Sequence, residues 1–419
     1  MGYILPSMLS FLLTGIYSII DGIFVGRALG DQGLAAINIA WPLVALIISA
    51  GTGIGLGASV MVSLNRGAGQ EDIAARMEGN AFILLFAASL ILTVLLYLFG
   101  TPLLLLLGAK GELLPGAQDY LHYLLLGAGI QIFASGLVPL MRNHGASFYS
   151  MCAMASGCIT NIILDYFFVF LFDLGLKGAA IATVFGEVLT LIFCIIFYAG
   201  KKNRIPLKSL RPSAQAIGSI LRVSASPFGL TYLPSVTIIF MNLQAMRYGG
   251  PEAVSAYAVL AYIISFMELL VQGIGDGSQP LLSLSQGGDD QKSLKSYSRW
   301  TFTLAMSFSL SGSLLFYLLH SALPAFYGTS GQAAGYIVHA APWFALVMLL
   351  YGLTKPAVSY FYATHRIIRS SFLVYGEICL TLLFIFLLPG FLGLEGVWYT
   401  IPAVQLVLGL FSIIFLLKK

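Results

Sequence analysis

Charged residues are scarce in this sequence. Only 9% of its 419 residues are Asp, Glu, Lys or Arg, whereas a soluble domain carries about 25%. Hydrophobic residues make up 58% of the chain, and the mean hydropathy is +0.92. This composition excludes an ordinary soluble domain and indicates a polytopic membrane protein.

Sequence motifs of enzymes and metal sites are also missing. The four cysteines show no C-x-x-C spacing, the five histidines are scattered, and neither GxxxxGK[ST] nor H-E-x-x-H occurs. We therefore expect no enzymatic activity and no cofactor. The net charge of +4 comes from residues in short loops, which membrane topology explains without a nucleic-acid partner. A channel is a further alternative, which single-channel current without counter-ion exchange would reveal.

Apolar runs of about 20 residues, the length that crosses a bilayer, predict twelve transmembrane helices. The sequence thus predicts an all-α membrane protein with six helices in each half. The expected spans are 3–25, 34–63, 79–99, 118–141, 150–172, 176–199, 224–247, 254–285, 298–320, 336–363, 369–391 and 395–417.

Basic residues are distributed unevenly between the loops. With both termini cytoplasmic, the inner loops and termini hold sixteen Lys and Arg and the outer loops hold four, Arg27, Lys110, Lys177 and Arg247. This bias predicts a multi-pass protein of the plasma (inner) membrane with both ends inside. The most basic segment predicts a cytoplasmic linker, 201–223, between an N-lobe, 1–200, and a C-lobe, 224–419.

The two halves are related by an internal repeat. Residues 53–67 align without gaps to 273–287, with seven of fifteen positions identical at an offset of 220, which also places Gly30 on Gly250. LGLKG (174–178) matches LGLEG (392–396) at an offset of 218. Six spans in each half make the repeats parallel, with a pseudo-two-fold axis along the membrane normal. Transporters of this kind place the substrate between the halves.

Polar side chains form helical stripes within the first half. Ser10, Thr14, Tyr17 and Asp21 share one face of the first helix. Asn161 and Asp165 lie four apart on the fifth helix, and so do Thr183 and Glu187 on the sixth. Ionised carboxylates are costly in hydrocarbon and most often mark an ion path. Two buried acids that repel each other would favour loading either H⁺ or Na⁺; the alternative is a static network that pins helices together.

The repeat does not reproduce these acids in the second half. Asp21 falls on Met241 at the offset of 220, and Asn161 and Asp165 fall on Cys379 and Leu383 at the offset of 218. The acid chemistry is therefore expected in the N-lobe alone.

The second half has polar residues of its own inside apolar spans. Glu268, Gln272, Asp276 and Gln279 form a loose stripe, and Lys355 and Glu377 lie within later helices. We expect Glu268, Gln272, Lys355 and Glu377 to contact a cationic substrate in a cavity rich in Phe, Met and Tyr. The alternatives are that Lys355 pairs with one of the acids or extends toward the inner surface.

Two segments resemble the MATE (multidrug and toxic compound extrusion) transporters. They are IIDGIFVGRALGDQGLAAINIAWPL with the following GTGIGLGASVMVSLNRGAGQED, and NIILDYFFVFLFDLGLKGAAIAT. The resemblance spans nearly the whole chain and implies two six-helix lobes. It also implies a cation site at Asp21, Asn161, Asp165 and Thr183 and a helix-bending role for Pro6. From the shared helix faces we expect Thr14, Tyr17 and Glu187 to surround that site.

The resemblance implies export of amphipathic, cationic compounds in exchange for H⁺ or Na⁺ by alternating access. The partners would be small amphipathic substrates and membrane lipid, and the chain would act as a monomer. The seventh span lacks the acid that some members carry there, which argues against a Na⁺ mechanism based on that acid. The alternative is a flippase of the same superfamily for lipid-linked oligosaccharides or peptidoglycan precursors; Lys355 is the one residue that favours it.

Overall fold

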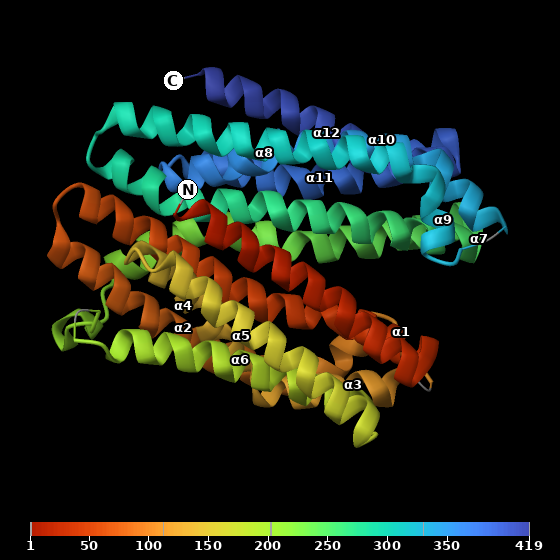
Figure 1. Cartoon of the computed structure of the whole chain (residues 1–419), viewed down its shortest axis with the longest axis horizontal. Helices are drawn as coiled ribbons and strands as arrows, with labels where there is room; N and C mark the ends of the chain where they lie inside the picture. Colours follow the sequence, from red (N-terminus) through yellow and green to blue (C-terminus); the bar gives the residue numbers. More distant parts are fainter. Residues whose placement is uncertain (1, 112, 202, 330, 419) are drawn as a thin grey trace. The chain divides into compact units, whose positions relative to one another are not determined.

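A computed structural model describes residues 2–111, 113–201, 203–329 and 331–418. Lys202 and Lys419, both counted above among the inner basic residues, lie outside this part. Helices form nearly all of the described chain, which contains no β-strand (Figure 1). The α-helices are α1 (Ile4–Gly67), α2 (Glu71–Leu106), α3 (Leu113–Leu126), α4 (Ala128–Asn143), α5 (Ser147–Asp165), α6 (Gly175–Ala199), α7 (Ala214–Gly287), α8 (Gln291–Leu319), α9 (Leu323–Phe326), α10 (Gly331–Ala363), α11 (Ile367–Leu392) and α12 (Leu394–Leu417).

The helices are long and apolar enough to cross a membrane repeatedly. Within the described residues ten helical segments meet that criterion, and α3 with α4, bent by 60° at Gly127, makes an eleventh. One of the ten, the 74-residue α7, is broken at Gly250 and so supplies two spans. The predicted all-α membrane fold is confirmed. Its span 118–141 is a bent pair rather than one straight helix. Gly127, at the bend, packs so closely on Val184 of α6 that a Cβ there would overlap it.

The first two spans of each half join through a glycine. Gly30 has φ 63° and ψ −159°, and Gly250 has φ 70° and ψ −166°. Side chains other than hydrogen are strongly disfavoured in that conformation. The repeat seen in the sequence therefore reproduces the same backbone break at the same offset of 220.

The offset between α5 and α11 differs from the prediction. Ser150 donates to the carbonyl of Val138, and Ser370 donates to that of Val358, which fixes the offset at 220. Asn161 and Asp165 therefore correspond to Thr381 and Ile385, not to Cys379 and Leu383.

The reason is that the first half is two residues longer after Asp165. There α5 passes into a π-helix, η1 (Tyr166–Leu171), whereas α11 continues as an α-helix to Leu392. The offset falls to 218 only beyond this segment. Gly178 packs on Phe168, and Gly396 packs on Leu388 in the same way. The two glycines are therefore counterparts at 218, whereas Phe168 and Leu388 are still counterparts at 220. The second half still has no carboxylate at either position.

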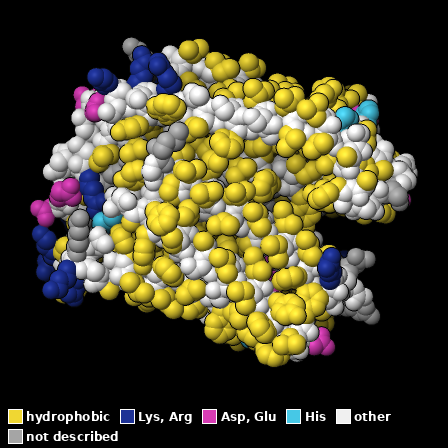
Figure 2. Space-filling view, viewed as in Figure 1, with side chains coloured by type: hydrophobic (Ala, Val, Ile, Leu, Met, Phe, Trp, Pro, Cys, Tyr) yellow, Lys and Arg dark blue, Asp and Glu magenta, His cyan; other side chains and the backbone are white. Residues whose placement is uncertain are grey.

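The chain divides into two compact units, each described by itself below. Unit 1 comprises Met1–Tyr232 and Ser283–Asp290, and unit 2 comprises Leu233–Leu282 and Gln291–Lys419. The lobe limits at 200 and 224 were expected from the sequence and stay a prediction. Figure 2 shows apolar side chains over the middle of the helices on the visible face, with Lys and Arg concentrated near helix ends.

The segment that joins α6 to α7 is fastened to α2 within unit 1. It contains a 3₁₀ turn, η2 (Leu207–Leu210). The buried Asn80 donates to the carbonyl of Arg211 and accepts from the backbone N–H of Ser213, at 3.2 and 2.9 Å. The Ser213 hydroxyl accepts in turn from the N–H of Ala216 and caps α7. The predicted linker is therefore an ordered part of unit 1 from Leu207 onward.

Candidate functional site

The hydroxyls of Ser10 and Thr14 in the polar stripe of α1, and that of nearby Ser18, are satisfied by their own helix. The hydroxyls of Ser10, Thr14 and Ser18 each donate to the carbonyl four residues earlier, at 2.9, 3.0 and 2.9 Å. This back-bonding removes the need for other partners. Asp21, one turn further on, cannot bond to a carbonyl of its own helix in this way, since a carboxylate accepts hydrogen bonds and donates none.

Close helix packing positions the polar residues of α5. A Cβ at Gly157 would overlap the Thr190 hydroxyl and the carbonyl of Gly186, so only glycines allow α5 and α6 this approach. One turn further on, the Asn161 amide donates to the Thr183 hydroxyl at 3.3 Å. Thr183 itself donates to the carbonyl of Ala179. The predicted pair of Asn161 and Thr183 is thus brought together.

Asp165 ends α5 and is fully buried. The chain then enters the π-helix η1, whose wider turns are frequent at functional sites. The Asp165 carboxyl interacts with that of Asp21 on α1, and the two can share a hydrogen bond when one is protonated. The two acids predicted to form one site do lie together.

The oxygens of this cluster lack partners. Asp21 Oδ1, Asn161 Oδ1 and both carboxyl oxygens of Asp165 are buried without a hydrogen bond from any described residue. A buried carboxylate without a partner is costly. A proton on one carboxyl, or a hard cation held by the oxygens, would relieve that cost. Three or more His, Cys, Asp or Glu do not converge as metal ligands anywhere in the described chain, so a cation here would be held by two carboxylates and an amide.

Tyrosines adjoin the acid pair. Tyr120 on α3 is 4% exposed and interacts with both Asp21 and Asp165. The half-buried Tyr17 on α1 interacts with Asp21 and with Glu187. Tyr17 stands out in the sequence as part of a polar stripe, whereas Tyr120 does not, because a single tyrosine among leucines gives no periodic signal.

The other expected neighbours of the site have different contacts. Thr14 shares a hydrogen bond with Cys158, and Glu187 interacts with Cys158 and Cys194. Pro6 lies in the first turn of α1, where its missing N–H breaks no helical bond. Its helix-bending role stays a prediction.

A second buried acid of unit 1 shows what a satisfied carboxylate looks like. Glu78 on α2 is 4% exposed. It contacts His144 Nε2 at 2.6 Å, accepts from the Tyr198 hydroxyl at 2.9 Å and lies 3.6 Å from Arg66 Nη2. This cluster was not predicted from the sequence, because its members lie on four separate segments.

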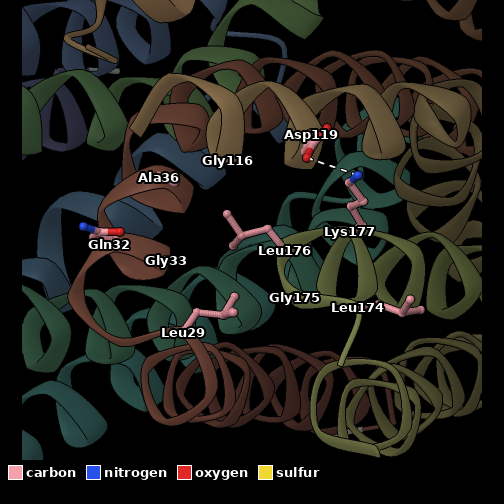
Figure 3. A pocket seen from close by; sticks show the side chains of 10 residues that line it. All are labelled: Leu29, Gln32, Gly33, Ala36, Gly116, Asp119, Leu174, Gly175, Leu176 and Lys177. Carbon is pink, nitrogen blue, oxygen red and sulfur yellow. Dashed lines mark ion pairs between the residues drawn. The ribbon is translucent and has the colours of Figure 1, made fainter. Parts of the chain in front are cut away.

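A pocket of about 330 Å³ lies beside the Gly30 break in unit 1 (Figure 3). Asp119 of α3 and Lys177 of α6 form an ion pair of 3.4 Å at its wall. Asp119 directly precedes Tyr120, so α3 carries both a pocket residue and a neighbour of the acid pair. The remaining lining residues are Leu29, Gln32, Gly33, Ala36, Gly116, Leu174, Gly175 and Leu176.

Unit 2 contains a charge cluster of a different kind. Lys355 of α10 is 3% exposed, and its Nζ lies 2.6 Å from Glu268 Oε1 and 3.2 Å from Glu377 Oε2. Gln405 donates to Glu377 at 2.8 Å and accepts from the Thr354 hydroxyl at 3.0 Å. Lys355 therefore pairs with both acids and does not extend to a surface.

The other members of the predicted polar stripe on α7 are also enclosed. Gln272 is 7% exposed, and Asp276 accepts a hydrogen bond of 2.7 Å from the Tyr362 hydroxyl. Whether the group Glu268, Gln272, Lys355 and Glu377 contacts substrate stays a prediction.

These features define a multi-pass α-helical membrane protein with an unsatisfied acid pair in one repeat. The family model MatE matches residues 6–167 and 230–387, so the chain belongs to the MatE family.

The most similar curated relatives include two staphylococcal proteins. "Multidrug export protein MepA" of Staphylococcus saprophyticus is 30% identical over 287 residues, which are 68% of this chain and 63% of that protein. The MepA of Staphylococcus aureus is 29% identical over the same shares. The match thus spans less than two thirds of the length of these curated relatives.

Solved structures confirm the fold. "Outward-facing conformation of a multidrug resistance MATE family transporter of the MOP superfamily" has a TM-score of 0.92 at 24% identity, over 100% of this chain and 96% of that chain. A MOP superfamily transporter from Pyrococcus furiosus, titled for the reverse polarity of its binding pocket, has a TM-score of 0.92 at 23% identity, over 99% and 93%.

Proposed function

We propose that this chain is a multidrug efflux antiporter that exports amphipathic cations across the plasma membrane in exchange for H⁺ or Na⁺. The single observation that carries the proposal is the set of four buried, unpartnered oxygens on Asp21, Asn161 and Asp165. Membership of the MatE family and relatives named for multidrug export support the same function.

The proposed mechanism follows from the charge of that cluster. Ion loading neutralises the acid pair and changes which arrangement of α1, α3, α5 and α6 is favoured. Release of the ion on the other side reverses the preference. Each charge that crosses the membrane contributes about 2.3 kcal/mol per 100 mV. Both termini are proposed to be cytoplasmic, and the acting unit is proposed to be a monomer.

The charge balance of unit 2 favours export of cations over the flippase alternative. Lys355 is the residue that a lipid pyrophosphate would need, and its ammonium is held by Glu268 and Glu377. With all three groups ionised, the cluster carries one net negative charge and would repel a pyrophosphate.

Transport in proteoliposomes tests the proposal, with the pH gradient and the Na⁺ gradient imposed separately. We expect uptake of a cationic dye under at least one gradient and none without either. The Asn161→Ala variant distinguishes the ions, because Na⁺ needs the amide oxygen as a ligand whereas a proton needs only a carboxylate. Transport of a lipid pyrophosphate with no dye transport would overturn the proposal in favour of the flippase.

A further inference from the structure

The charge cluster of unit 2 contains its own bound ammonium. Lys355 Nζ lies 2.6 Å from one carboxylate and 3.2 Å from the other. It also lies 4.8 Å from the centre of the Tyr351 ring. Two carboxylates and an aromatic face are the groups by which proteins recognise ammonium ligands. The lysine thus occupies a cation-binding arrangement supplied by its own chain.

The carboxylates present more surface than the ammonium does. The side chain of Lys355 is 3% exposed, compared with 12% for Glu268 and 26% for Glu377. A ligand that reaches the cluster therefore meets Glu377 first. Gln405 also donates a hydrogen bond to Glu377 and accepts one from the Thr354 hydroxyl.

The cluster is one positive charge short of neutrality. Glu268 and Glu377 contribute two negative charges and Lys355 one positive charge, whereas Gln405 and Thr354 are uncharged. One added positive charge neutralises the group, and a second would be buried without compensation.

We propose that Lys355 sets the charge of the exported compound: it cancels one of two carboxylates, so that the cluster accepts a monovalent organic cation and rejects a divalent one. The inference rests on the proposed export function and adds a residue that determines its substrate specificity. Without Lys355 the same carboxylates would suit a dication.

Binding to the purified full-length protein at pH 8 tests the charge rule. The probes are tetraphenylphosphonium, with one charge, and methyl viologen, with two. Lys355→Met leaves a net charge of −2 and is expected to shift the affinity ratio toward methyl viologen by about tenfold or more. The double variant Lys355→Met with Glu377→Gln restores −1 and is expected to restore the wild-type ratio.

The matched control is Lys208→Met, which removes a lysine from the exposed pair with Asp72 and is expected to leave the ratio unchanged. An unchanged ratio in Lys355→Met, or a double variant that keeps the shifted ratio, would overturn the inference. If Lys355→Met does not fold, the single variant Glu377→Gln tests the inference. It makes the cluster neutral, so tetraphenylphosphonium should bind about tenfold more weakly. An unchanged affinity for tetraphenylphosphonium in this variant would also overturn the inference. Absence of gradient-driven export would refute the proposed function, while the binding ratio would still report on Lys355.

Discussion

The two repeats share a backbone break yet treat their buried carboxylates in opposite ways. In unit 1, oxygens of Asp21 and Asp165 are buried without partners. In unit 2, Glu268 and Glu377 hold a lysine between them. Buried acids that a fixed cation neutralises stabilise a fold, whereas unpartnered acids impose a cost that only a mobile ion can remove. Under the proposed function, the first repeat exchanges an inorganic ion at its unpartnered acids, whereas the second keeps a constant charge.

The largest effect is expected at the unpartnered acid. Asp165→Asn removes the charge that an ion would neutralise, so we expect gradient-driven export to fall to background in proteoliposomes and drug resistance to be lost at normal expression. The matched control is Asp173→Asn, the same change at an exposed acid eight residues later, which should export as the wild type does. Full export by both Asp21→Asn and Asp165→Asn would remove the distinction between the repeats.

The free energy of unfolding should fall more when the lysine of unit 2 is replaced than when the acid of unit 1 is replaced. Lys355→Met leaves two carboxylates without their counter-ion and is expected to cost about 3–5 kcal/mol of unfolding free energy. Asp165→Asn should cost nothing or stabilise, because a neutral amide is easier to bury than an unpartnered carboxylate. Unfolding in detergent, followed by fluorescence, measures both, with Lys208→Met in the exposed pair with Asp72 as the surface control, expected within about 1 kcal/mol of wild type. Equal losses for Lys355→Met and Asp165→Asn would contradict the comparison.

The shared break should show equal costs in both repeats. Gly30→Ala and Gly250→Ala each force a side chain into a positive-φ conformation, which we expect to destabilise by about 1–3 kcal/mol. A Cβ at Gly30 would touch nothing, and one at Gly250 would meet only the flexible end of Glu252. The loss is therefore a backbone effect, measurable by the same unfolding experiment. Gly218→Ala, a helical glycine with free space around it, is the control and should not destabilise.

The smallest effect is expected at Thr183, the uncharged partner of Asn161 in the acid cluster of unit 1. Thr183→Val removes the hydroxyl that accepts from the Asn161 amide, a bond worth about 1 kcal/mol. We expect the coupling ion to be needed at about fivefold higher concentration for half-maximal export. Thr190→Val, seven residues along the same helix, removes a hydroxyl that bonds backbone carbonyls only and should leave the ion dependence unchanged. The same shift in both variants would count against a site at Asn161.

The sequence predicted the helices and the acid pair well because both follow simple rules. A run of about 20 apolar residues is enough to predict a membrane span. Asp21 and Asp165 stand out because they are charged residues within such runs. The close packing of Gly127 on Val184 was not predictable, since the two residues lie more than fifty positions apart. Tyr120 and Glu78 were missed for the same reason: the partners that make them notable come from other helices.

The register of the second half was predicted with an error that has a local cause. LGLKG and LGLEG gave an offset of 218, which holds for α6 and α12 but not for α5 and α11. The two additional residues lie between Asp165 and Gly178, within the π-helix and the loop after it. A π-helix has no marker in composition, so the change of offset became visible only in the backbone.

Those two residues give the acid-bearing segment spare length that its duplicate lacks. Asp165 therefore lies where an α-helix passes into a wider π-helix, and Gly157, eight residues earlier, packs closely against α6. The corresponding Ile385 lies inside an unbroken α-helix that continues to Leu392. The two copies thus differ in the backbone beside this position as well as in its side chain.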